Sequence, residues 1–135
     1  MKIEFSVDLS DLEFDINKLE KAISEEIETT AYKIERTSKE LVPVDTGTLR
    51  RSITVEGGML EFDVFTNVEY AHYMEYGTSP HRIEGRPYLF WQGALHPVKS
   101  VMHTGTKPYL YITTAFDEHT ATLDTRIAEI IEDVL

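Results

Sequence analysis

Residues 44–47 read Val-Asp-Thr-Gly, and Asp-Thr-Gly is the setting in which aspartic proteases hold a catalytic carboxylate. That chemistry needs two carboxylates that share one proton, so a chain of 135 residues would have to dimerise to supply the second. The motif follows the pattern of a long helix, whereas such proteases are almost wholly β. A homodimeric protease using Asp45 is therefore an alternative hypothesis. The structural interpretation is that Asp45 or Thr46 caps one helical turn over residues 47–51.

The five histidines are the other candidates for chemistry, as metal ligands. His72 and Glu75 share the i, i+3 spacing of one helix face, while His81, His96 and His103 follow no ligand spacing such as HExxH. Cysteine is absent, which excludes disulfides, thiolate nucleophiles and Cys-ligated zinc. We therefore expect no catalytic residues, no metal site and no cofactor.

The charge of the chain is strongly negative, with 13 Lys and Arg against 24 Asp and Glu, a net charge of −11. A protein that grips duplex phosphates needs a basic footprint, so the total argues against one. Residues 78–110 are the exception, because this segment contains four bases and a single acid; the bases are Arg82, Arg86, Lys99 and Lys107. A small DNA-binding accessory module therefore remains a second alternative. No apolar run approaches the ~20 residues that span a bilayer, and we expect no membrane partner.

The spacing of apolar residues predicts the elements that position these residues. Residues 1–9 alternate polar with apolar, as in a half-buried strand, and residues 17–41 repeat apolar positions every three or four residues, as in a helix that Pro43 ends. Strands are predicted over 52–56 and 59–66 around a Gly57-Gly58 turn, then a short helix over 69–76 that stops at Gly77.

Residues 78–108 contain four of the five prolines and predict an elaborated loop with strands near 88–92 and 98–103. Residues 109–135 return to helical spacing. The order predicts one α+β domain over residues 1–135, in which an antiparallel sheet packs against two long helices and a loop or hairpin makes an excursion. Aromatic residues gather at Tyr70, Tyr73 and Tyr76 and again over residues 88–91. We expect Tyr73 or Tyr76 to point inward and part of 88–91 to point outward, as at a protein interface.

Four short motifs in a fixed order resemble the small bacteriophage neck proteins, which are the tail-completion or head–tail joining proteins of long-tailed phages. Residues 41–53 read LVPVDTGTLRRSI, residues 70–78 read YAHYMEYGT, Pro80-His81 follows, and residues 103–108 read HTGTKP. The positions that match the family motifs are Pro43, Asp45, Thr46, Gly47, Leu49, Arg50, Ser52, Tyr70, Ala71, Tyr73, Glu75, Gly77, Thr78, His103, Gly105 and Pro108.

The resemblance implies a non-enzymatic virion protein that forms a ring between the connector and the tail tube. Its partners would be copies of itself and neighbouring phage connector or tail proteins, with DNA passing through without sequence-specific binding. A closed ring needs two unlike patches on each subunit, and the basic segment of an acidic chain supplies one. The residues expected at the subunit interface are Arg82, Arg86, Tyr88, Phe90, Trp91, Lys99 and Lys107. The acidic remainder is expected to repel DNA from the channel wall.

Overall fold

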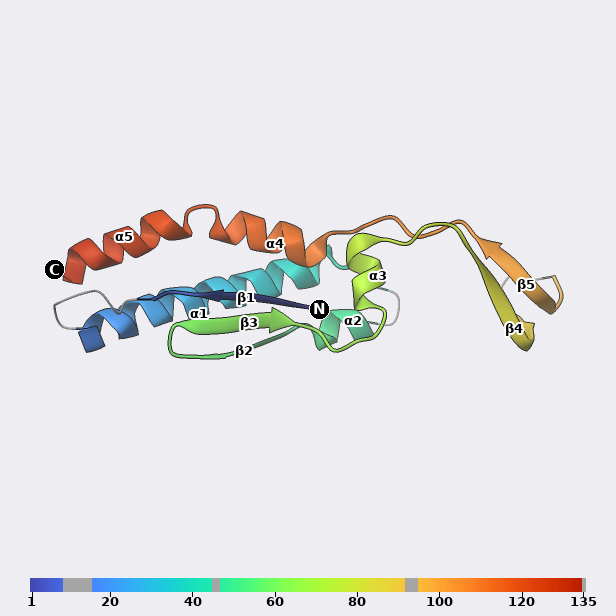
Figure 1. Cartoon of the computed structure of the whole chain (residues 1–135), viewed down its shortest axis with the longest axis horizontal. Coiled ribbons are helices and arrows are strands. Elements are labelled where there is room, and N and C mark those ends of the chain that lie inside the picture. Colours follow the sequence, from blue (N-terminus) through green and yellow to red (C-terminus); the bar gives the residue numbers. More distant parts are fainter. Residues whose placement is uncertain (9–15, 45–46, 92–94, 135) are drawn as a thin grey trace.

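The computed structural model describes residues 1–8, 16–44, 47–91 and 95–134 (Figure 1). Three antiparallel strands form a sheet in the order β1-β3-β2, where β1 is Lys2–Ser6, β2 is Thr54–Gly58 and β3 is Glu61–Phe65. Over residues 1–8 exposed and half-buried side chains alternate, which confirms the predicted period of two. The apolar side chains of β1 therefore all lie on one face of the sheet, and that face packs against the rest of the protein.

The long helix α1, Ile16–Leu41, confirms the prediction from periodicity. Its buried residues recur every three or four positions, and the helix ends directly before Val42-Pro43 because a residue preceding proline is disfavoured in helical geometry. The side chains of Leu19, Ile23, Ile27 and Ile34 are fully buried and form the middle of the core.

The C-terminal helical region is present but is divided into α4, Tyr111–Thr120, and α5, Leu123–Val134. Arg126 supports the interruption, because its guanidinium donates to the freed carbonyl of His119 at 2.7 Å and also pairs with Glu26 of α1. At the same place Thr120 Oγ1 donates to the carbonyl of Phe116 at 2.7 Å, a local bond that competes with helix propagation.

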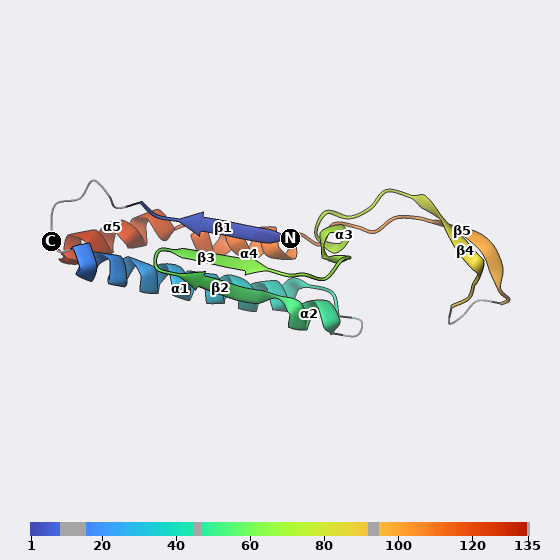
Figure 2. The same ribbon diagram turned by 60° about the horizontal axis from the view of Figure 1, so that its bottom comes forward.

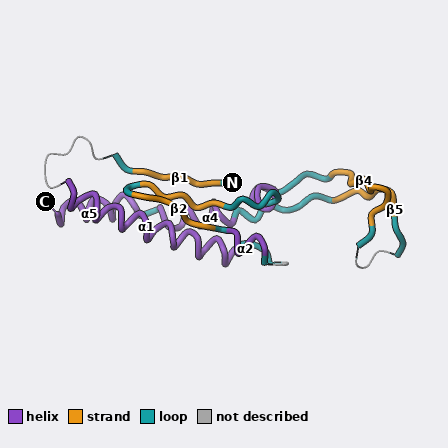
Figure 3. Tube along the Cα trace, turned by 90° about the horizontal axis from the view of Figure 1, so that it is seen from below, coloured by secondary structure: helices purple, strands orange, loops and turns teal. Residues whose placement is uncertain are grey.

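The sheet and the helices form two layers, which confirms the α+β class (Figures 2 and 3). The helices α4 and α5 pack on α1, and α1 packs on β2 and β3. The edge strand β1 reaches α4 through Phe5 and Phe116, whose ring centroids lie 6.3 Å apart in an edge-on arrangement. The apolar core lies between the two layers.

The turn of the β2–β3 hairpin differs from the predicted Gly57-Gly58 turn. Both glycines belong to β2, and the turn lies at Met59 and Leu60, where Leu60 has a φ of 62°. Its N–H donates to Ser24 Oγ of α1 at 3.3 Å, which ties the turn to the helix layer. Gly57 is needed for a different reason: a Cβ there would lie closer than 3.0 Å to the ring of Phe62 on the paired strand.

The remaining elements lead away from this body. Two short helices, α2 (Thr48–Ser52) and α3 (Ala71–Tyr76), flank the end of the sheet, and strands β4 (His81–Leu89) and β5 (Val98–His103) form a separate antiparallel ribbon. The β4–β5 ribbon projects beyond the body in every view (Figures 1, 2 and 3). The predicted strand over 98–103 is confirmed, while the predicted strand over 88–92 is wrong in its bounds because β4 begins earlier and ends at Leu89.

Candidate functional site

Helix α3 holds the start of α4 through a buried carboxylate. Glu75 has no exposed surface, and its two oxygens accept hydrogen bonds from the N–H groups of Ile112 (3.0 Å) and Thr113 (2.8 Å). The hydroxyl of Thr113 donates to the same carboxylate at 2.6 Å. A negative group at the first turn of a helix satisfies free N–H donors and complements the helix dipole. Glu75 therefore supplies the cap that Leu110, the residue at the N-cap position of α4, does not provide.

A second bond joins the same two helices. The hydroxyl of the buried Tyr111 donates to the carbonyl of Ala71 at 2.9 Å, and Ala71 is itself buried. Burial, together with the nearby charge of Glu75, raises the pKa of the Tyr111 hydroxyl above its usual range. The motif over residues 70–78 therefore acts as a clamp between the body and the segment that returns from the ribbon.

The base of the ribbon brings the motifs at 70–78 and 103–108 together. Thr78 and Thr106 form a bridge in which each backbone N–H donates to the other's carbonyl, at 3.0 and 3.1 Å. Gly77 ends α3 with a φ of 76°, and a Cβ at this position would lie 2.6 Å from the carbonyl oxygen of Thr106. Gly105, with a φ of 92°, meets Thr78 in the same way from the other side. Both glycines are required by close approach and by left-handed backbone geometry.

His81 and His103 face each other across the first pair of the ribbon. Their ring centroids lie 5.0 Å apart, and Nδ1 of His103 accepts a hydrogen bond from the N–H of Gly105 at 3.0 Å. Within the described parts of the chain, no three histidine, aspartate or glutamate side chains come together as a metal site would require. The two rings contact each other at the base of the ribbon.

The motif over residues 41–53 leads into the core. Leu49 and Ile53 are buried, and the hydroxyl of Ser52 donates to the carbonyl of Leu49 and contacts the hydroxyl of Thr66, each at 2.6 Å. Pro43 is half-buried after α1, and Arg50 is exposed on α2.

Asp45 and Thr46 lie outside the described residues. The structure places Gly47, with a φ of 81°, at the N-cap of α2, so the helical turn begins at Thr48, one residue later than predicted. A capping role for Asp45 or Thr46 stays a prediction.

The residues expected at the subunit interface all lie on the ribbon or its flanks and are exposed; they are Arg82, Arg86, Tyr88, Phe90, Trp91, Lys99 and Lys107. Phe90 and Trp91 are 68% and 48% exposed and line an open apolar groove of about 460 Å³ with Leu89, Val101 and Met102. Exposed aromatic residues that gather on a projecting element are typical of a protein-binding surface.

Arg82 is also engaged within the ribbon. Its guanidinium pairs with Glu84 at 2.8 Å and donates to the hydroxyl of Ser100 on the opposite strand at 2.9 Å.

The aromatic residues expected to point outward, within residues 88–91, are exposed. The expectation that Tyr73 or Tyr76 points inward is wrong, because these side chains are 55% and 54% exposed. Helix α3 buries Ala71 and Glu75, which leaves its tyrosines on the opposite side.

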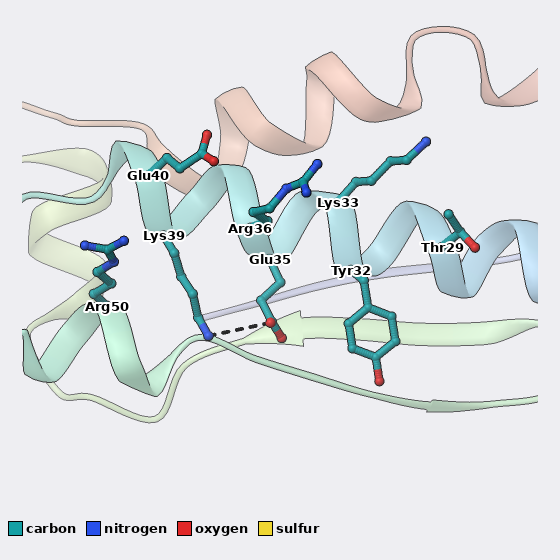
Figure 4. A pocket seen from close by; sticks show the side chains of 8 residues that line it. All are labelled: Thr29, Tyr32, Lys33, Glu35, Arg36, Lys39, Glu40 and Arg50. Atoms are coloured by element: carbon teal, nitrogen blue, oxygen red, sulfur yellow. Dashed lines mark ion pairs between the residues drawn. The ribbon is translucent and has the colours of Figure 1, made fainter.

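A groove on the body was missed by the sequence interpretation. The α1–α2 groove has a volume of about 630 Å³ and carries four bases and two acids; its lining residues are Thr29, Tyr32, Lys33, Glu35, Arg36, Lys39, Glu40 and Arg50 (Figure 4). The repeat of Lys33, Arg36 and Lys39 at three-residue spacing was visible in the sequence. The addition of Arg50 from another helix was not.

Comparison with known proteins gives one family. Residues 10–77, which are half of the chain, match the family described as "Bacteriophage HK97-gp10, putative tail-component". This range contains the motif at 41–53 and nearly all of the motif at 70–78. No curated protein and no solved structure matches the chain. Among the described residues, none of the helices combines the length and apolar character needed to cross a membrane.

Proposed function

This chain belongs to the HK97-gp10-like family of bacteriophage tail components, and from that premise we propose that it completes the tail by joining it to the head. In this proposal the chain is a structural protein of the virion neck. Copies of it form a ring around the DNA channel, and the β4–β5 ribbon contacts a neighbouring subunit or the next ring. The chain acts by binding other phage proteins rather than by catalysis.

The observation that carries the proposal is the projecting ribbon with its exposed aromatic residues. Tyr88, Phe90 and Trp91 lie on an element that packs on itself and extends past the body (Figure 1). Aromatic side chains are enriched at protein interfaces because they combine a large contact area with few rotatable bonds. The described residues of the ribbon contribute no buried side chain to the core of the body, so the aromatic side chains of the ribbon are free to fill a pocket on another chain.

The charge distribution supports the placement around DNA. The net charge of −11 repels phosphate, and a channel wall of this sign lets DNA pass without binding.

The family motifs also have a physical role in this proposal. The clamp made by Glu75, Tyr111 and the Thr78–Thr106 bridge sets the angle at which the ribbon leaves the body.

The proposal is tested in a phage from which the gene has been deleted and which is complemented with variants of the chain. Because both side chains are exposed, Phe90→Ser with Trp91→Ser should leave the fold intact and weaken the contact by about thirtyfold or more. Electron microscopy of the lysate should then show free heads and free tails in place of joined particles.

Met59→Ser is the matched control, because Met59 is 61% exposed on the turn of the other hairpin. It should restore joined particles to the wild-type level. Normal joining by the Phe90 and Trp91 variant would contradict the role of the ribbon. Normal joining without the gene would contradict the proposed function itself.

A further inference from the structure

The α1–α2 groove and the outer side of α5 carry opposite charges at opposite ends of the body. We propose that the groove of one subunit binds the α5 acidic face of a second copy of this chain. The α5 acidic face consists of Asp124, Glu129, Glu132 and Asp133, all of which are exposed. The inference rests on the proposed function, because it names the surface through which copies of the chain join side by side.

The cations of the groove are available for a partner. Lys39 pairs with Glu35 at 3.5 Å, but within the described part of the chain Lys33, Arg36 and Arg50 have no ion-pair partner. They come from two different helices, as Figure 4 shows, and all three are exposed. On a chain with a net charge of −11, a groove with an excess of base is the surface to which an acidic segment of another copy is drawn.

The α5 acidic face matches the groove in spacing as well as in sign. Lys33 and Arg36 are three residues apart on α1, and Glu129 and Glu132 are three residues apart on α5. Both pairs therefore repeat along a helix at about 4.5 Å. The single base of α5, Arg126, is turned toward Glu26 of α1 and does not reduce the negative charge of the outer side.

The composition of the groove favours a protein partner over a nucleic acid. Glu35 and Glu40 line it beside the bases, and a continuous phosphate backbone would meet both carboxylates. Tyr32, which is half exposed, adds an apolar surface that suits a helix face.

The relative position of the two surfaces determines the kind of assembly. The groove is lined by the C-terminal half of α1 and by Arg50 of α2. Helix α2 lies at one end of the body, and α5 ends at the other (Figure 1). Contact between two different patches on identical chains is heterologous, and repetition of such a contact closes a ring when the rotation per subunit allows it. The ribbon remains free to contact a further layer.

Sedimentation velocity of the purified full chain tests the inference. We expect wild-type association that weakens as salt is raised. The groove variant Arg36→Glu with Arg50→Glu, and the face variant Glu129→Arg with Glu132→Arg, should each raise the dissociation constant roughly tenfold or more, and combining all four substitutions should restore association.

Two control variants separate the groove and the face from net charge. Lys21→Glu and the pair Glu25→Arg with Glu28→Arg change exposed positions elsewhere on α1 and should leave the dissociation constant within about threefold of wild type. Equal association of wild type and groove variant would overturn the inference, as would a wild-type chain that stays monomeric. Loss of duplex DNA binding in the groove variant, with self-association unchanged, would also overturn it in favour of a phosphate partner.

Complementation of the gene-deleted phage distinguishes this inference from the proposed function. Joined particles that require the gene but form equally well with the groove variant would leave the proposed function standing and overturn the groove contact. Joined particles that form without the gene would end the proposed function, while sedimentation would still decide the contact.

Discussion

Glu75 connects two segments that lie 37 residues apart in the sequence, and its substitution tests the clamp directly. In Glu75→Gln the amide nitrogen replaces an oxygen that accepts from a backbone N–H, so two donors face each other in a buried place. We expect the free energy of unfolding to fall by about 2–3 kcal/mol, measured by urea denaturation at pH 7. Glu69→Gln, the same change at an exposed position before α3, should cost less than about 0.5 kcal/mol. Equal losses would contradict the buried cap.

Tyr111 makes the stability depend on pH in the alkaline range. Because burial raises the pKa of its hydroxyl, the folded chain keeps the proton above pH 10 while the unfolded chain loses it. Stability therefore falls as pH rises through that range, with a slope of at most about 1.4 kcal/mol per pH unit from this one proton. Tyr111→Phe should cost about 1 kcal/mol at pH 7 and show a smaller alkaline loss than wild type. Parallel curves between pH 9 and 11 would count against the buried hydroxyl.

The sequence was informative about single residues only where their roles are local. Gly77 was predicted to end a short helix, and it does so with positive φ. The partners of Glu75 could not be predicted, because nothing near it in the sequence marks Ile112 or Thr113 as donors. The prediction that Tyr73 or Tyr76 points inward was wrong for the same reason: which side of a short helix is buried depends on the element that packs against it.

At the scale of elements, the β2–β3 hairpin shows why glycine has two different uses. Gly57→Ala would place a Cβ against the carbonyl of Glu61 and the ring of Phe62, so strand β2 must shift. We expect thermal unfolding to show a loss of about 1–3 kcal/mol. Gly58→Ala is the matched control, since a Cβ there meets nothing within 4 Å and should cost well under 1 kcal/mol. A larger loss from Gly58→Ala would place the turn at the glycines after all.

Elements with a strong period were predicted and those set by packing were not. Alternation predicted β1, and the repeat of three and four predicted α1 and the C-terminal helical region. The hairpin turn is displaced by two residues because Gly57 serves close packing rather than the turn. At the break between α4 and α5, Arg126 bonds to the carbonyl of His119 and to Glu26, and the local sequence gives no signal of either bond.

At the scale of the whole molecule, the two layers and the projecting ribbon have different roles. The sheet and the helices enclose the core, and the ribbon carries exposed aromatic residues beyond it (Figure 2). The sequence predicted the two layers and an excursion over residues 78–108. It did not predict that the excursion is an independent ribbon, because its composition, rich in proline and in aromatic residues, fits a loop as well as a hairpin.

The net charge of the chain also did not predict how charges are arranged on its surface. A total of −11 argues against duplex binding, yet the α1–α2 groove gathers bases from two helices. In the proposed ring these bases face the α5 acidic face of the next copy, and the acidic remainder keeps DNA from adhering. In this proposal surface charge has two roles, association between subunits and exclusion of phosphate.

In the proposed function, copies of this chain form a ring where the head meets the tail. Electron cryomicroscopy of purified particles of the phage that encodes this chain can detect that ring. We expect a closed ring of this chain at the junction, with the β4–β5 ribbons in contact with a neighbouring subunit or layer. A complete junction whose density contains no copy of this chain would contradict it.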